Sequence, residues 1–82
     1  MDPLLKVNVS SSEKIIWEGQ AESVSSINSQ GPFDILPYHA GFVTLIENDP
    51  IVIRPKGEKP LKFELKRSVL YVHNDVVSIY TI

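Results

Sequence analysis

The chain has 82 residues, 43% of them hydrophobic and 22% charged, which fits a single domain over residues 1–82. Its 8 Lys and Arg and 10 Asp and Glu are scattered along the chain, so we expect no nucleic-acid partner, because phosphate binding needs concentrated positive charge. The absence of cysteine excludes disulfides, thiolate metal sites and cysteine nucleophiles.

No apolar run in the sequence approaches the roughly 20 residues that cross a bilayer. Residues 1–12 contain only the short apolar pair Leu4 and Leu5, which is too little for a signal peptide. We therefore expect a chain that is soluble when isolated and at most peripheral to a membrane.

Segments rich in β-branched and aromatic residues recur about every eight to twelve residues, separated by Gly, Pro, Asn and Asp. This spacing predicts an all-β fold, a small antiparallel two-sheet β-sandwich of about eight to ten short strands. The predicted strands, in chain order, are residues 4–10, 14–22, 24–28, 33–36, 41–47, 51–54, 61–65, 69–73 and 76–81.

In the first half of the chain, Trp17 follows Ile15 and Ile16 on a predicted strand. It is interpreted as a core side chain, with a binding anchor as the alternative. Four serines follow, at positions that predict a solvent face or a sheet edge: Ser23, Ser25, Ser26 and Ser29.

In the second half, turns are predicted at residues 48–50, 55–60 and 73–75, where Pro, Gly, Asn and Asp gather. The last of these should join two paired strands through Asn74 and Asp75, which tolerate a positive φ. Alternation over residues 61–66 predicts one packed face (Leu61, Phe63, Leu65) and one solvated face (Lys62, Glu64, Lys66).

The residues suited to general-base catalysis near neutral pH are His39 and His73, and neither lies in a recognisable catalytic motif. His73 is expected to be exposed beside its turn, and the two histidines lack the spacing of a zinc site. Acidic residues are dispersed, and the glycines are isolated. The sequence therefore predicts no catalytic residue, cofactor, metal or small-molecule substrate.

Residues 31–45 are apolar, aromatic and rich in Gly and Pro, which is typical of a specific crossing between two sheets. One interpretation is structural: Phe33, Ile35 and Leu36 are core, and the chain turns at Pro37. The other is functional: Tyr38 and His39 face outward as a recognition patch.

At this segment the chain resembles the epsilon subunit family of rotary ATP synthases. That family typically carries a glycine, an aromatic or leucine, an Ile-Leu-Pro-Gly-His-Ala-Pro run and a threonine. The corresponding residues here are Gly31, Phe33, Ile35, Leu36, Pro37, Tyr38, His39, Ala40, Gly41 and Thr44. Resemblance extends over nearly the whole chain through Val7, Val9, Ser11, Glu13, Trp17, Glu18, Gly19, Phe63, Leu65, Val69, Leu70, Val72, Asn74, Val76 and Val77.

The sequence departs from this pattern at four positions. Tyr38 replaces a glycine, Gly41 replaces a proline, and Lys66 and Arg67 stand where a glycine pair usually turns the chain. The chain also ends at Ile82, without the family's C-terminal helical hairpin. The sequence is therefore expected to be either a naturally short form or a piece of a longer chain, and inhibition or nucleotide sensing attributed to that hairpin is not carried over.

The resemblance implies a non-catalytic central-stalk subunit, peripheral on the cytoplasmic face of the membrane, that couples ion-driven rotation to ATP synthesis. By position, the side toward the gamma subunit would be Tyr38, His39, Ala40 and Phe42. The side toward the membrane ring would be Ser29, Gln30, Gly31, Pro32 and Phe33. One alternative is a free-standing β-sandwich adaptor, and another is a small enzyme or ligand-binding barrel around His39, which would require a deep polar pocket.

Overall fold

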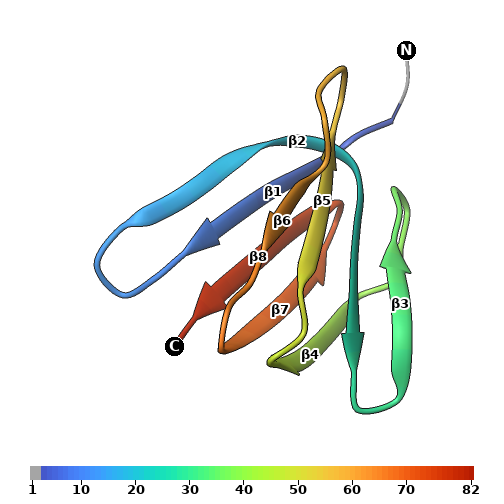
Figure 1. Ribbon diagram of the computed structural model, residues 1–82. Helices are drawn as coiled ribbons and strands as arrows, with labels where there is room; N and C mark the ends of the chain where they lie inside the picture. The colour runs from blue at the N-terminus through green and yellow to red at the C-terminus, as the bar shows by residue number, and fades with distance from the viewer. Residues whose placement is uncertain (1–2) are drawn as a thin grey trace.

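The computed structural model describes residues 3–82 and contains eight strands and no helix in that range (Figure 1). The strands are β1 (Leu5–Ser10), β2 (Ile15–Asn28), β3 (Gly31–Ile35), β4 (Phe42–Glu47), β5 (Ile51–Pro55), β6 (Leu61–Phe63), β7 (Arg67–His73) and β8 (Val76–Thr81). The predicted all-β fold class is therefore confirmed.

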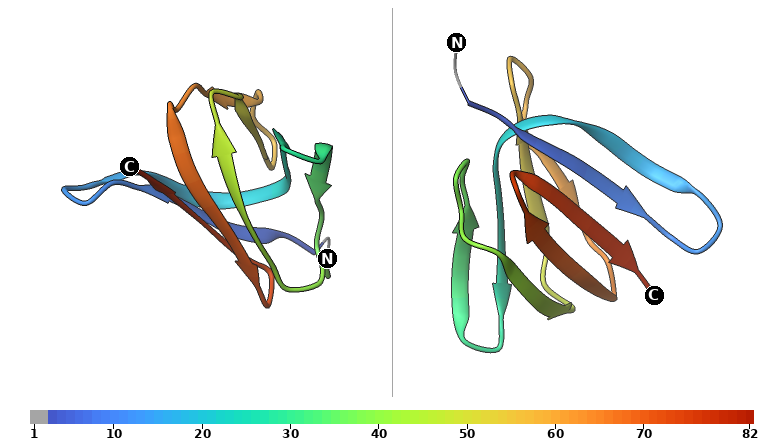
Figure 2. Two further views of the ribbon diagram at one scale, coloured as in Figure 1. Left: turned by 90° about the horizontal axis from the view of Figure 1, so that it is seen from below. Right: turned by 180° about the vertical axis from the view of Figure 1, so that it is seen from behind.

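Strand β2 bends near its middle and contributes to both layers of the sandwich, as Figures 1 and 2 show. Its first half pairs with β1 in a layer ordered β4-β7-β8-β1-β2, and its second half pairs with β3 and β5. The register with β5 shifts between Ala21 and Ser23. The prediction of two strands here is wrong, because Ser23 lies at an irregularity within a continuous strand rather than in a turn.

The strand pairing is mixed rather than wholly antiparallel. Strand β1 pairs antiparallel with β2 but parallel with β8, where Val7 lies opposite Val77 and Val9 opposite Ile79. The antiparallel prediction is wrong for this one pair. Alternating side chains show which face of a strand is buried, but they contain no information on the direction of its neighbour.

The core lies between the inward faces of the two layers. In the first layer, paired side chains form buried rows across β1, β8 and β7, such as Val7, Val77 and Val72. The second layer contributes buried side chains from β2, β3 and β5: Val24, Ile35, Ile51 and Ile53. Burying one such side chain stabilises the fold by about 1.5–3 kcal/mol, so these rows hold the layers together.

The predicted turns are present. Asn74 and Asp75 have φ values of 48° and 61°, as expected for a tight two-residue turn between the paired strands β7 and β8. Gly57, with φ of 72°, lies in the loop joining β5 and β6. The predicted alternation over 61–66 is confirmed, because Leu61, Phe63 and Leu65 are half-buried whereas the three charged residues between and after them are exposed.

The serine prediction is wrong for two of the four residues. Ser23 and Ser26 are only 8% and 6% exposed, whereas Ser25 is half-buried and Ser29 exposed. The Ser26 hydroxyl donates to the Pro50 carbonyl at 2.9 Å, which satisfies it inside the sandwich. A hydroxyl with a nearby carbonyl can be buried at little cost, and composition alone does not reveal such a partner.

Candidate docking sites

The loop between β3 and β4 contains Tyr38 and is tied to the β7–β8 hairpin. Tyr38 has φ of 69° and is 82% exposed. Its backbone N–H donates to Oδ1 of Asp75 at 2.7 Å. Because a left-handed conformation is costly for a residue with a Cβ, this bond helps to hold Tyr38 in a backbone shape that a glycine would adopt freely.

The remaining residues predicted on this side differ in exposure. Ala40 is exposed, and His39 is half-buried, with Nδ1 2.7 Å from the Ala40 carbonyl. Since a carbonyl only accepts, Nδ1 carries the proton in this contact. The His39 ring packs edge-on against Phe42 at a centroid distance of 5.6 Å, and Phe42 itself packs against the core. Phe42 therefore supports the loop from beneath.

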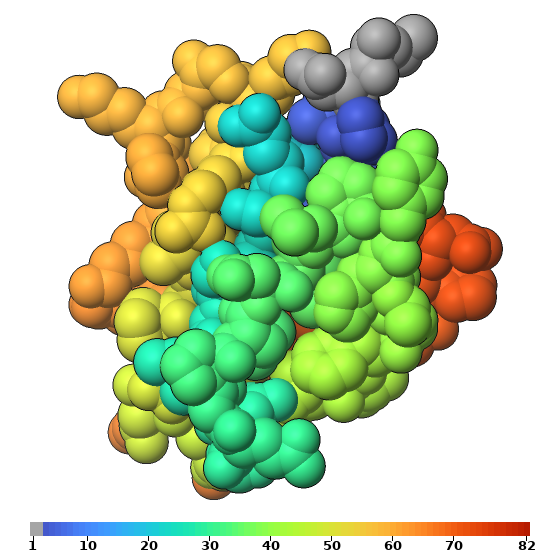
Figure 3. Space-filling view, turned by 90° about the vertical axis from the view of Figure 1, so that its right-hand side faces the viewer, coloured from blue at the N-terminus to red at the C-terminus, as the bar shows by residue number. Residues whose placement is uncertain are grey.

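Residues from the β7–β8 hairpin complete this part of the surface. Tyr38, His39 and Ala40 line an open depression together with Gly41, His73, Asn74 and Asp75. Figure 3 shows the segment after β3 lying next to this hairpin on the molecular surface. His73 is exposed, as the sequence predicts, but its place in the same depression as His39 was not predicted, because the two lie on separate elements.

The second predicted site is the turn between β2 and β3. Ser29, Gln30 and Pro32 are exposed, and Gly31 has φ of 116°, where a side chain would be strained. Asn28 fixes the turn: its Oδ1 accepts from the Gln30 N–H at 2.9 Å and its Nδ2 donates to Thr44 Oγ1 at 3.1 Å. The turn is therefore a polar tip anchored to β4.

The two predicted sites lie at opposite ends of β3, a strand of five residues and therefore about 15 Å long. Phe33 is half-buried at the middle of β3, and its ring contacts that of Phe42 edge-to-face with centroids 5.4 Å apart. Each phenylalanine belongs to a different predicted site. The contact between them links the two sites through the edge of the core.

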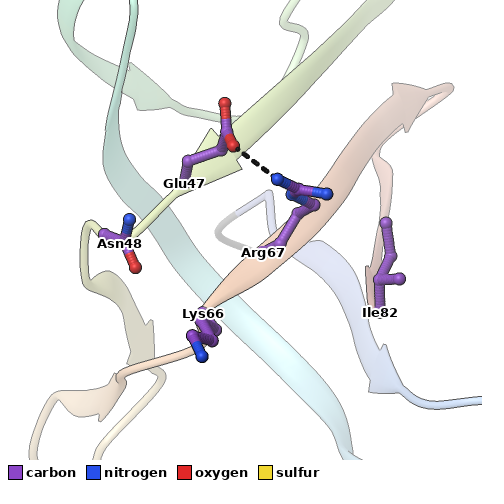
Figure 4. A pocket seen from close by; sticks show the side chains of 5 residues that line it. All are labelled: Glu47, Asn48, Lys66, Arg67 and Ile82. Carbon is purple, nitrogen blue, oxygen red and sulfur yellow. Dashed lines mark hydrogen bonds and ion pairs between the residues drawn. The ribbon is translucent and has the colours of Figure 1, made fainter.

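The two basic residues that replace the family's glycine pair cause no backbone strain. Neither Lys66 nor Arg67 has a positive φ; instead Asn48 has φ of 60° and donates its N–H to the Lys66 carbonyl at 2.9 Å. Arg67 Nη2 lies 3.1 Å from Glu47 Oε2 beside an open depression (Figure 4). Both side chains are exposed, so this pair contributes at most about 1 kcal/mol to stability.

No reaction centre assembles within residues 3–82. Those residues contain no group of three or more His, Asp or Glu placed to hold a metal ion. The depression beside His39 is open rather than deep, and the groups around it include no nucleophile paired with a base. None of residues 3–82 forms a helix of the length and apolar character that crossing a membrane requires.

These features define a small β-sandwich domain with two anchored turns. Residues 4–81 match the family described as ATP synthase, Delta/Epsilon chain, beta-sandwich domain. The chain belongs to this family, which confirms the resemblance seen in its sequence.

Individual relatives agree with this assignment. The chain is 38% identical over 77 residues to the ATP synthase epsilon chain of Leptospira borgpetersenii and 32% identical over 75 residues to that of Brevibacillus brevis. These matches cover 94% and 92% of this chain, which spans 60% and 57% of the two relatives.

Solved structures match the fold. One chain in the Euglena gracilis mitochondrial ATP synthase (OSCP/F1/c-ring) matches with a TM-score of 0.88 at 14% identity, covering 99% of this chain and 52% of that one. Another, in the Tetrahymena thermophila mitochondrial ATP synthase (central stalk/c-ring), has a TM-score of 0.80 at 13% identity and covers 95% of this chain and 63% of that one.

Proposed function

We propose that this chain is the β-sandwich domain of an epsilon-type subunit in the central stalk of a rotary ATP synthase. In this role it catalyses nothing itself, contacts the gamma subunit and the membrane ring, and helps to pass ring rotation to the catalytic head. It is peripheral to the membrane, on the cytoplasmic face, through that complex. The observation that carries the proposal is the family match over residues 4–81, from before β1 to the end of β8.

Within this proposal, the two anchored turns are the two contact sites. The loop of Tyr38, His39 and Ala40 faces gamma, and the tip formed by Ser29, Gln30, Gly31 and Pro32 faces the ring. Phe33 and Phe42, which pack inward, support the two sites rather than touch the partners. A rigid domain transmits torque better than a flexible one. Turns that are already ordered also lose less conformational entropy on binding.

The proposal is tested by reconstitution with the catalytic head, depleted of its own epsilon subunit, and the membrane ring of the same source. We expect the chain to co-purify with both and to restore coupling of ATP hydrolysis to ion movement across vesicle membranes. If it associates with neither assembly, the proposal is wrong, and a free-standing adaptor role is favoured.

A further inference from the structure

The side-chain amide of Asn28 connects the two layers of the sandwich beside the turn at residues 28–31. Its Nδ2 donates to Thr44 Oγ1 on β4 at 3.1 Å, and its Oδ1 accepts from the Gln30 N–H at 2.9 Å. Strand β4 belongs to the first layer, whereas this half of β2 pairs with β3 and β5 in the second. One amide group therefore joins the backbone of the turn to the opposite layer.

The hydrogen-bond partners fix the orientation of this amide. The Gln30 N–H can only donate, so it must face Oδ1, and this leaves Nδ2 directed toward Thr44. The Thr44 hydroxyl accepts from Nδ2 and donates over a longer distance, 3.4 Å, to the Leu45 carbonyl. The Asn28 amide therefore cannot rotate without breaking a hydrogen bond at one of its ends.

Thr44 is itself held in place. It is half-buried and lies opposite the fully buried Leu70, so its side chain is on the inner face of β4 together with Phe42 and Ile46. A β-branched side chain also has restricted freedom at χ1. The Thr44 hydroxyl is therefore a fixed point to which the Asn28 amide is attached.

Loss of this hydroxyl should release the turn. Asn28 is half-buried, and a donor without a partner in such a place is unfavourable, so the amide would rotate toward water. That rotation would withdraw Oδ1 from the Gln30 N–H. Ser29 and Gln30 are exposed and bury little surface that could hold them instead, which leaves only the pairing of Asn28 with Gly31.

We propose that Thr44 is a positioning residue for the turn at residues 28–31 and that it acts through Asn28 rather than by touching a partner. The inference rests on the proposed function, in which this turn faces the membrane ring. A turn that is ordered before binding loses less conformational entropy when it binds. The Thr44 hydroxyl therefore raises affinity for the ring from a place inside the sandwich.

The first test follows the turn in the free chain. Thr44→Val has nearly the same shape but lacks the hydroxyl, and Thr44→Ser is the matched control that keeps it. We expect amide hydrogen exchange at Gln30 to be at least about tenfold faster in Thr44→Val and unchanged in Thr44→Ser. The Tyr38 N–H, bonded to Asp75 at the other end of β3, should exchange at the wild-type rate in both variants. If exchange at Gln30 does not accelerate in Thr44→Val, Thr44 does not hold the turn and the inference is wrong.

The second test measures binding to two assemblies from the same source: the whole ATP synthase depleted of epsilon, and its catalytic head depleted of epsilon. The difference between the two affinities reports the contact with the ring. We expect Thr44→Val to bind the whole enzyme about tenfold more weakly, which corresponds to ordering roughly one residue on binding. Its affinity for the head should change less than about twofold, and Thr44→Ser should bind both assemblies within about threefold of wild type.

A double variant tests whether Thr44 acts through Asn28. In an Asn28→Ala background the amide is gone, so adding Thr44→Val should weaken binding to the whole enzyme no further. If Thr44→Val causes the same loss in both backgrounds, Thr44 does not act through Asn28 and the inference is wrong.

Failure of this inference and failure of the proposed function give different results. If wild type and Thr44→Val both bind the whole enzyme equally well, and more tightly than they bind the head, Thr44 is not a positioning residue although the proposed function stands. If wild type binds the whole enzyme no more tightly than the head, the ring contact of the proposed function fails and this inference fails with it.

Discussion

At the scale of single residues, Ser68 lies in an unfavourable environment. It is 0% exposed on β7, and its hydroxyl has no hydrogen-bond partner among residues 3–82. A buried hydroxyl without a partner costs roughly 1–3 kcal/mol relative to an apolar atom of similar size. We therefore expect Ser68→Ala to raise the free energy of unfolding by about 1 kcal/mol, measured by urea denaturation.

Ser26 provides the matched control for this substitution. It is 6% exposed, but its hydroxyl donates to the Pro50 carbonyl, so Ser26→Ala should lower the free energy of unfolding by about 1 kcal/mol. If both substitutions shift the free energy of unfolding in the same direction, a hydrogen-bond partner does not decide the effect of removing these hydroxyls.

Tyr38 shows the cost of a side chain in a left-handed turn. Its φ of 69° suits glycine, and its ring is too exposed to offset the cost by burial. We expect Tyr38→Gly to be more stable than Tyr38→Ala by about 1 kcal/mol in chemical denaturation, because alanine keeps the strained Cβ and removes only the ring. Equal stability of the two variants would show that the Asp75 contact or the loop relieves this strain.

At the scale of elements, the projecting β1–β2 hairpin depends on a close fit between Trp17 and Gly19 (Figure 1). A Cβ on Gly19 would lie 3.0 Å from Cη2 and Cζ2 of the Trp17 ring. We expect Gly19→Ala to displace the indole toward water, moving its fluorescence emission to longer wavelength and lowering stability by about 1 kcal/mol. Trp17 is the only tryptophan, so its emission reports this one site.

Gly41→Ala is the control for the hairpin. A Cβ there would meet only the Val72 carbonyl, at 3.8 Å, and Gly41 has no positive φ. It should leave the emission unchanged and raise stability by about 0.5 kcal/mol through the unfolded state. An emission shift in both variants, or in neither, would contradict packing of the indole over Gly19.

An element could be predicted from sequence when the residues that determine it are close together in the chain. The β7–β8 hairpin was predicted with correct ends for β8, because Asn74 and Asp75 favour the positive φ of its turn. The parallel pairing of β1 with β8 was not predicted, because it joins the two ends of the chain and leaves no local pattern. The continuity of β2 was missed for a different reason: Ser23 lies at a register shift within the strand, which the sequence alone does not distinguish from a turn.

The candidate site follows the same rule. Tyr38 and Ala40 are exposed in a loop that its prolines and glycines mark, whereas Phe42, predicted on the side toward gamma, packs against the core. Strand β4 reads Phe, Val, Thr, Leu, Ile, so apolar residues fall on both faces and periodicity does not show which face is buried. The exposure of Val43 and Leu45 on the opposite face of β4 was not predicted for this reason.

At the scale of the whole molecule, the two proposed contact sites are joined by packing rather than by sequence. β3 separates them, and the edge-to-face contact of Phe33 with Phe42 spans the gap. A stalk subunit that binds two partners needs a rigid link between its two contact sites. If the link were flexible, rotation of one partner would deform the domain instead of turning the other partner. In this arrangement Phe42 has a structural role, and its removal should loosen the segments at both ends of β3.

We therefore expect Phe42→Ala to lower the free energy of unfolding by about 2 kcal/mol, less than for a fully buried phenylalanine because Phe42 is half-buried. Amide hydrogen exchange should accelerate both in the loop at residues 36–40 and in the turn at residues 28–31, because both lose support from the same ring. Tyr38→Ala, an exposed aromatic in the adjacent loop, should not accelerate exchange at residues 28–31. If Phe42→Ala leaves stability and exchange unchanged yet weakens binding to the catalytic head, Phe42 contacts the partner directly and the two sites are mechanically independent.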